Sequence, residues 1–134
     1  MKLMSEDNRA VKTLGPAART TTATGTGVDL MGFNGCLVLI NGGLWTDGTH
    51  TFSLEHCDDD ATYVTVPAGD MDATPPVVSS GSNDETLFQI SYVGSKRYLR
   101  AKCTVTGSPS TGLVWSAMIL RMDPTVRPSA AVVS

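Results

Sequence analysis

The chain has 134 residues, of which 41% are hydrophobic and 17% are charged, and its formal net charge at pH 7 is −3. This length fits one domain of ordinary size, and the small acidic surplus argues against binding nucleic acid through a broad basic surface. No run approaches the ~18 apolar residues of a membrane-spanning helix, and Glu6 and Asp7 interrupt any secretory signal, so we expect neither membrane insertion nor secretion.

Residues 1–18 differ from the rest of the chain, because they carry mixed charge and no sustained apolar period. We expect an N-terminal arm here, extended or disordered, that either becomes ordered on a partner or stays a loose terminus. Residues 19–29 are rich in Thr with small residues between, which predicts a polar edge strand loosened by Gly25 and Gly27.

The strongest strand signals come next. Residues 36–40 form a continuous apolar run, which predicts a strand covered on both faces. The turn at Asp47-Gly48 favours a hairpin with the following strand, because Gly supplies a positive φ without steric penalty. Residues 51–56 alternate between apolar and polar side chains, so this strand has one core face. Its predicted core side chains are Phe52, Leu54 and His56.

Three aspartates at residues 58–60 then end the strand. Their spacing lacks the alternate ligands and later Glu of an EF-hand loop, so we interpret them as a solvated turn and predict no metal site. A short strand is expected at 62–66, followed by a long connection over 67–76.

The second half of the chain repeats the strand pattern over residues 87–93, 97–105 and 113–121. The alternation predicts these core side chains: Phe88, Ile90, Tyr92, Leu99, Ala101, Cys103, Val105, Leu113, Trp115, Ala117 and Ile119. The last strand is apolar on its second face as well. It is therefore either central in a sheet or in contact with another subunit.

The pattern as a whole predicts an all-β fold: an antiparallel β-sandwich or jelly roll of about seven or eight strands at regular spacing. We expect the arm over residues 1–18, the sandwich over 19–122 and an extended tail over 123–134. Pro124 and Pro128 favour the extended form of that tail.

No catalytic constellation is visible, and we expect no enzyme activity and no cofactor. The three cysteines form no C-x-x-C pair and sit in apolar runs, so we interpret them as small buried hydrophobes. His50 and His56 lie about 20 Å apart on one predicted strand, too far to share a metal, and His56 is expected to be a hydrogen-bonded core or rim group.

Two sets of residues are candidates for contacts. The basic residues at 96, 97, 100 and 102 form a patch that is either a solvated strand face or a site for an acidic protein surface. The arm, the tail and the second face of the last strand are candidates for contact with another protein or another subunit. Their predicted contact residues are Lys2, Arg9, Lys12, Arg19, Val114, Met118, Leu120 and Arg127.

Four motifs stand out along the chain: DLMGFNG at 29–35, TDGTHTF at 46–52, EHCD at 55–58 and ISYVGSKRYLR at 90–100. Their order resembles a family of small virion structural proteins of tailed bacteriophages, most of all a jelly-roll head decoration, or cement, protein. The closing strand to Arg121 and its Pro-containing tail complete the likeness, which spans about residues 19–128.

The resemblance implies a non-enzymatic protein on the capsid surface of a virion, made in the cytoplasm of a bacterial host. Its implied partners are the major capsid protein and itself, as a homotrimer, with no nucleic acid and no membrane. Many weak contacts on a lattice would act together by avidity.

Two alternatives remain open from the sequence. One is a head-completion or tail component of the same particle. The other is a carbohydrate-binding β-sandwich, in which Trp45, Tyr63 or Trp115 would stack on a sugar.

Overall fold

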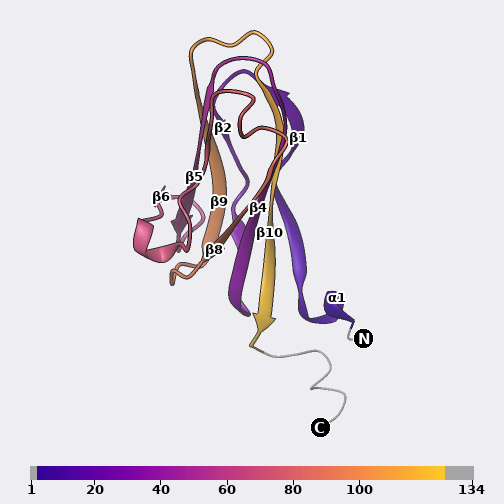
Figure 1. The fold of residues 1–134 in the computed structure, drawn as a ribbon. Helices are drawn as coiled ribbons and strands as arrows, with labels where there is room; N and C mark the ends of the chain where they lie inside the picture. Colours follow the sequence, from indigo (N-terminus) through magenta and orange to yellow (C-terminus); the bar gives the residue numbers. More distant parts are fainter. Residues whose placement is uncertain (1–2, 126–134) are drawn as a thin grey trace.

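The computed structural model describes residues 3–125, apart from the side chain of Glu6. Two β-sheets pack face to face into an elongated sandwich, with a single helical turn at the N-terminal end (Figure 1). The elements are α1 (Met4–Asp7), β1 (Arg9–Arg19), β2 (Ala23–Thr24), β3 (Val28–Asp29), β4 (Phe33–Trp45), β5 (Thr49–Cys57), β6 (Val64–Thr65), the 3₁₀ turn η1 (Ala68–Asp70), β7 (Val77–Val78), β8 (Leu87–Tyr92), β9 (Tyr98–Thr106) and β10 (Leu113–Pro124).

The strand order is that of a jelly roll. Sheet A runs β1-β10-β4-β8, and sheet B runs β2-β9-β5-β6, with β3 also paired to β9 and β7 also paired to β5. All pairs are antiparallel. If β2 with β3 and β6 with β7 each count as one interrupted strand, the ten strands within residues 3–125 become eight, four in each sheet. The predicted fold class is confirmed.

The predicted hairpin at Asp47-Gly48 is wrong, although the turn itself is present with Gly48 at φ +84°. β4 lies in sheet A and β5 in sheet B, so the turn carries the chain from one layer to the other. Both edges of each strand are already occupied: β10 and β8 flank β4, while β9 and the short strands β6 and β7 flank β5. A turn signal predicts the reversal of the chain but not which strand becomes the hydrogen-bonded neighbour.

The predicted N-terminal arm over residues 1–18 needs the same kind of correction. Residues 9–19 form β1, an edge strand of sheet A that pairs along β10 from Arg9 opposite Arg121 to Arg19 opposite Leu113. The sequence pattern does not predict this strand, because its register against β10 shifts twice and the shifts break the regular alternation of side chains. The sandwich therefore begins at Arg9, and β10 continues to Pro124, two residues beyond the expected boundary. Residues 126–134 of the predicted tail lie outside the described residues.

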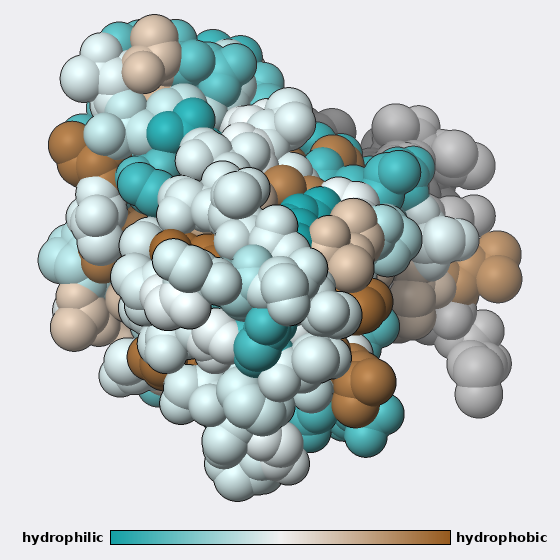
Figure 2. Space-filling model, turned by 90° about the horizontal axis from the view of Figure 1, so that it is seen from above, coloured by the Kyte–Doolittle hydropathy of each residue, from teal (hydrophilic) through white to brown (hydrophobic). Residues whose placement is uncertain are grey.

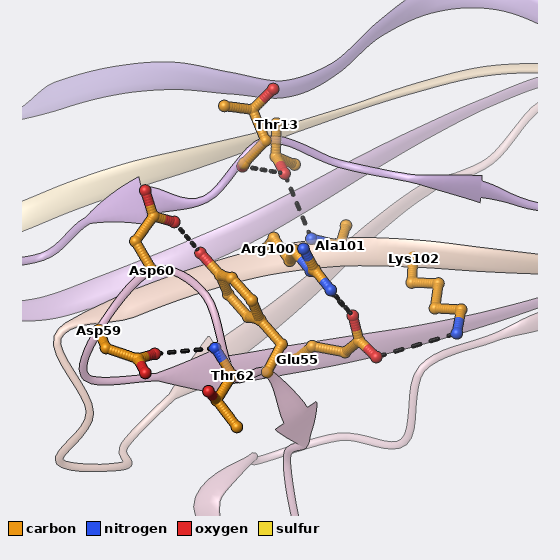
Figure 3. Close-up of polar contacts among 10 residues, drawn as sticks. Thr13, Glu55, Asp59, Asp60, Thr62, Arg100, Ala101 and Lys102 are labelled. Atoms are coloured by element: carbon orange, nitrogen blue, oxygen red, sulfur yellow. Dashed lines mark hydrogen bonds and ion pairs between the residues drawn. The ribbon is translucent and has the colours of Figure 1, made fainter.

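Thr13 ties the two sheets together at this edge. It lies at the first register shift of β1 and is 3% exposed. Its hydroxyl donates to the carbonyl of Thr26 at 2.8 Å and accepts the N–H of Ala101 at 3.3 Å, as Figure 3 shows for the second contact. Gly25 passes so close that a Cβ there would lie 2.2 Å from the Thr13 hydroxyl oxygen. The bulge thus closes one side of the sandwich with a buried, satisfied polar group.

The core lies between the sheets and confirms the predicted alternation. Phe52 of sheet B meets Trp115 of sheet A edge to face, with ring centroids 4.8 Å apart. The predicted core residues are buried, except Phe88 and Val105, which are partly buried against the same cluster. Residues of β4 behave differently from the prediction: Val38 and Ile40 are fully buried, but Leu37 and Leu39 remain partly exposed on the other face.

Candidate interaction surface

The outer face of sheet A is apolar across three adjacent strands. Leu37 and Leu39 of β4 lie directly opposite Leu120 and Met118 of β10, and Ala10 of β1 lies on the other side of Leu120. We call this surface the apolar face. It consists of Ala10, Leu37, Leu39, Val114, Met118, Leu120 and Met122. Val114 is 43% exposed and Met118 36% exposed, so side chains of a kind that normally lie in a core face outward here.

Charge is nearly absent from this face. Among the outward positions of the paired strands of sheet A, Lys12 is the one ionisable residue, and it lies opposite Met118 on the edge strand. The remaining outward positions of these paired strands include the exposed Leu87 of β8 and small or uncharged polar side chains such as Ser116, Asn41 and Gln89. A solvated face of an antiparallel sheet is normally polar, so this composition is typical of a surface that meets another protein.

The outer face of sheet B has the opposite character. Glu55 of β5 accepts Arg100 at 2.8 Å and lies 3.9 Å from the ammonium of Lys102, both on β9, and Figure 3 shows the three side chains turned toward one another. Arg100 also stacks over the ring of Tyr63, with its guanidinium carbon 3.6 Å from the ring centroid. Threonine and serine fill other outward positions of these strands.

The predicted basic patch is neutralised within the chain. Besides the Glu55 pairs, Lys96 contacts the carboxylate of Asp58 at 3.1 Å and Arg97 contacts that of Asp29 at 2.9 Å. The hydrogen bond from Lys96 holds the pKa of Asp58 below its ordinary value, and that from Arg97 does the same for the pKa of Asp29. Of the two interpretations of the patch, the structure therefore favours a solvated strand face.

A shallow apolar groove of about 410 Å³ extends the apolar face toward the N-terminal end. It is lined by Met4, Ser5, Asn8, Ala10, Leu120 and Met122. Figure 1 shows α1 beside the end of β10, which is how the helical turn forms one wall of the groove. No charged side chain lines this groove, so the apolar surface continues from the middle of sheet A to α1.

The predicted contact residues separate into three groups. Lys12, Val114, Met118 and Leu120 share the outer face of sheet A. Arg9 and Arg19 do not join them, and Lys2 and Arg127 lie outside the described residues.

Arg19 has a role within the fold. Its guanidinium donates to the carbonyls of Trp115 at 2.8 Å and Gly15 at 2.5 Å, and its carbon lies 4.5 Å from the Trp115 ring centroid. Burial lowers the pKa of Arg19. Arg9 donates to the carbonyls of Ser5 and Asn8, which fastens α1 to β1.

Sequence reasoning missed Leu37, Leu39 and Met122 as members of the apolar face. The continuous apolar run at residues 36–40 predicts a strand buried on both faces, so it indicates no exposed leucines. Met122 is the last residue of the predicted sandwich, next to the predicted tail. Only the register of β4 against β10, which brings together residues about 80 positions apart, places these side chains beside Met118 and Leu120.

The histidines and cysteines confirm their predicted structural roles. His56 is buried, and its Nδ1 lies 2.7 Å from the hydroxyl of Tyr92. His50 is also buried, with Nε2 3.0 Å from the carbonyl of Asp47. All three cysteines are buried and unpaired. Within residues 3–125, no group of three or more His, Cys, Asp or Glu side chains is placed to hold a metal ion. No helix in this part of the chain is long and apolar enough to span a membrane.

The three aromatic residues considered for sugar stacking are largely engaged. Trp115 is 1% exposed. The indole N–H of Trp45 donates to the carbonyl of Gly48 at 2.8 Å, and the ring of Tyr63 is covered by Arg100. The burial of Trp115 and the position of Arg100 over Tyr63 do not favour these two rings as stacking platforms, because a platform needs a free ring face, whereas the in-plane N–H bond of Trp45 covers neither face of its ring.

The fold defines the chain as a jelly-roll protein, and comparison with solved structures agrees. One similar structure is the crystal structure of the SPBc2 prophage-derived protein YomS, with a TM-score of 0.53 and 16% sequence identity over 85% of this chain and 92% of that chain. Identity this low shows a shared fold alone. Comparisons with protein-family models and with the sequences of curated proteins give no match.

Proposed function

We propose that this chain is a non-enzymatic virion structural protein of a tailed bacteriophage. In this role it binds the major capsid protein on the outer surface of the head and stabilises the capsid lattice as an oligomer, a homotrimer. Neither a cofactor nor a nucleic acid takes part.

Two likenesses support the phage assignment. The sequence motifs resemble those of small phage virion proteins, and the fold is similar to that of a protein described as prophage-derived. The jelly roll is common among both capsid and lectin domains. The fold is therefore consistent with the proposal, but it does not distinguish a capsid role from other binding roles.

The observation that supports a role in assembly is the apolar face of sheet A. Seven outward side chains, centred on Met118 and Leu39, form a surface that water solvates poorly, while the outer face of sheet B is polar and internally ion-paired. A protein that works by assembly needs such a surface, and a lattice multiplies the effect of each contact through many copies.

Binding to capsids tests the proposal. Fluorescently labelled protein should bind empty, expanded capsids of the parent phage at a saturating, fixed ratio to the capsid subunit. Bound capsids should also break open at a higher temperature than bare ones. Failure to bind these capsids under conditions in which the protein is folded contradicts the decoration role.

A further inference from the structure

We propose that the apolar face of sheet A is covered by a second copy of this chain. The inference goes beyond the proposed function: two identical faces that meet close a two-fold pair, so this contact joins two copies, is separate from the contacts of the proposed homotrimer, and leaves capsid binding to other surfaces. Met118 and Leu39, which lie opposite each other on β10 and β4, form the centre of the interface.

The composition of the face is that of an interface core. Such cores are depleted of charged residues and enriched in methionine relative to other protein surfaces. Met118 and Met122 belong to the face itself, and Met4 lines the adjoining groove. Flexible thioether side chains adapt to a partner surface that is itself flat and apolar.

The distribution of charge favours a copy of this chain over a charged partner. When two identical surfaces meet, any charge cluster meets its own sign, which is unfavourable. The apolar face avoids this problem, because its one cation, Lys12, lies on the edge strand β1, where its ammonium can reach solvent. A surface built for a charged partner would carry complementary charges, and the charged residues of the sandwich gather on sheet B instead.

The size of the face is also sufficient. Its three strands at a spacing of ~4.8 Å and a paired length of ten residues at ~3.3 Å give roughly 500 Å² for one copy and roughly 1,000 Å² for two. Specific protein interfaces begin at about this area. Burial of the groove beside α1 would add to it.

The loop end of the sandwich offers no comparable surface. Figure 2 looks onto this end and shows hydrophilic and neutral residues over most of it, with hydrophobic residues in separate small groups. The long strands β10 and β4 place Met118 and Leu39 on the side of the molecule, away from those loops.

Methionine oxidation tests the inference on the unaltered chain. Met118 is 36% exposed and Met31, which lies outside the apolar face, is 66% exposed. Both thioethers are therefore open to hydrogen peroxide in a single copy. When the protein is concentrated enough to associate, oxidation of Met118 should slow several-fold relative to its own rate in dilute solution, while Met31 keeps its rate. Peptide mass spectrometry measures both rates.

A pair of matched variants tests the same surface by sedimentation. Met118→Glu places a carboxylate at the centre of the face, opposite Lys12, so the single copy should stay folded. Because a buried charge is costly in an interface, we expect the dissociation constant to rise by roughly 100-fold or more. The control is Thr104→Glu, which puts the same side chain on an exposed outward position of β9. It should leave association unchanged, and circular dichroism checks the fold of both variants.

Three results would overturn the inference: a wild-type chain that stays monomeric at ~100 μM, a concentration at which a dissociation constant of about 100 μM would leave half of the chains associated; an oligomer in which Met118 oxidises at its dilute rate; or equal effects of the two variants. If Met118→Glu does not fold, the oxidation rates decide. If the chain is monomeric but still binds expanded capsids, the proposed interface is wrong and the decoration role stands. If the chain associates through the apolar face but does not bind capsids, the interface stands and the decoration role is wrong.

Discussion

The carboxylate of Asp47 accepts a hydrogen bond from the backbone N–H of Gly112 at 2.5 Å, joining two turns that lie 65 positions apart in the sequence. The same carboxylate accepts the N–H groups of Ser110 at 2.7 Å and Thr111 at 3.2 Å. One acidic side chain thus holds the loop between β9 and β10 against the turn between β4 and β5. Because both connections cross between the sheets, this contact helps to fix the two layers relative to each other.

Replacing Asp47 with Asn should destabilise the fold, since the amide has one acceptor oxygen and no charge to strengthen these bonds. We expect a lower melting temperature and a weaker dependence on pH. The hydrogen bond from Gly112 is the main reason that the pKa of Asp47 is below its ordinary value. A lowered carboxyl pKa in the folded state contributes stability above the unfolded value, and that contribution is lost as pH falls through the folded value.

The acid titration of Asp47 should therefore be visible below about pH 4, the ordinary value of an aspartate. Asp59 contributes in the same direction, because hydrogen bonds from the backbone of Thr62 and Ala61 lower its pKa to about 2. Melting curves across this range should show the wild type losing stability more steeply than the Asp47→Asn variant. Parallel curves for the two proteins would show that Asp47 does not act through its charge.

Gly112→Ala tests the other half of the contact. Gly112 has φ +79°, and a Cβ at this position would lie 1.9 Å from the carbonyl oxygen of Arg19. The positive φ alone costs about 1–3 kcal/mol for a residue with a side chain, and the collision adds to it, so we expect a loss of at least about 2 kcal/mol in the free energy of unfolding. Gly15→Ala is the control, because nothing lies within 4 Å of a Cβ there. Urea unfolding of both variants measures the difference.

Ion pairs on sheet B should differ in strength according to their exposure. Glu55 has a side chain 12% exposed and contacts both Arg100 and Lys102, so Glu55→Gln should cost about 1 kcal/mol of folding stability. Asp58 has a side chain 64% exposed in its pair with Lys96, and Asp58→Asn should change the melting temperature little at moderate salt. If the two variants are equally destabilised, burial is not what sets the strength of these pairs.

The cysteine thiols should be unreactive in the folded protein. Burial raises the pKa of Cys36 and Cys103 to about 12, and all three cysteines are buried. Since the thiolate is the reactive form, an aromatic disulfide reagent at pH 8 should modify the native chain slowly and the unfolded chain within seconds. Rapid release of the chromophore from native protein would contradict this placement of the thiols.

Much of the sandwich could be predicted because its strands alternate regularly. In β5, β9 and β10 the core side chains repeat every second residue, and the structure confirms each of these faces. The apolar second face of β10 was likewise predicted, together with two explanations for it. The strand is central in sheet A, and yet Val114 and Met118 remain exposed, so a central position does not cover them.

The remaining features depend on contacts between distant residues. β1 was mistaken for an arm because the bulge at Thr13 breaks its alternation, and its pairing with β10 spans about 100 positions. The Asp47-Gly48 turn indicated a reversal but not the change of sheet. Leu37 and Leu39 became part of the apolar face only through their register with β10. The local alternation of side chains predicts which face of a strand is buried. It does not predict which strands pair, because pairing depends on the topology of the whole sheet.

An image of the parent particle by electron cryomicroscopy, at a resolution that distinguishes a jelly roll, tests the central claim most directly. The proposed function predicts density for this sandwich on the outer surface of the head, repeated across the lattice, and the proposed interface adds pairs of copies in contact through sheet A. Density for this chain in the tail or at the head-to-tail junction would contradict the decoration role, as would its absence from the particle.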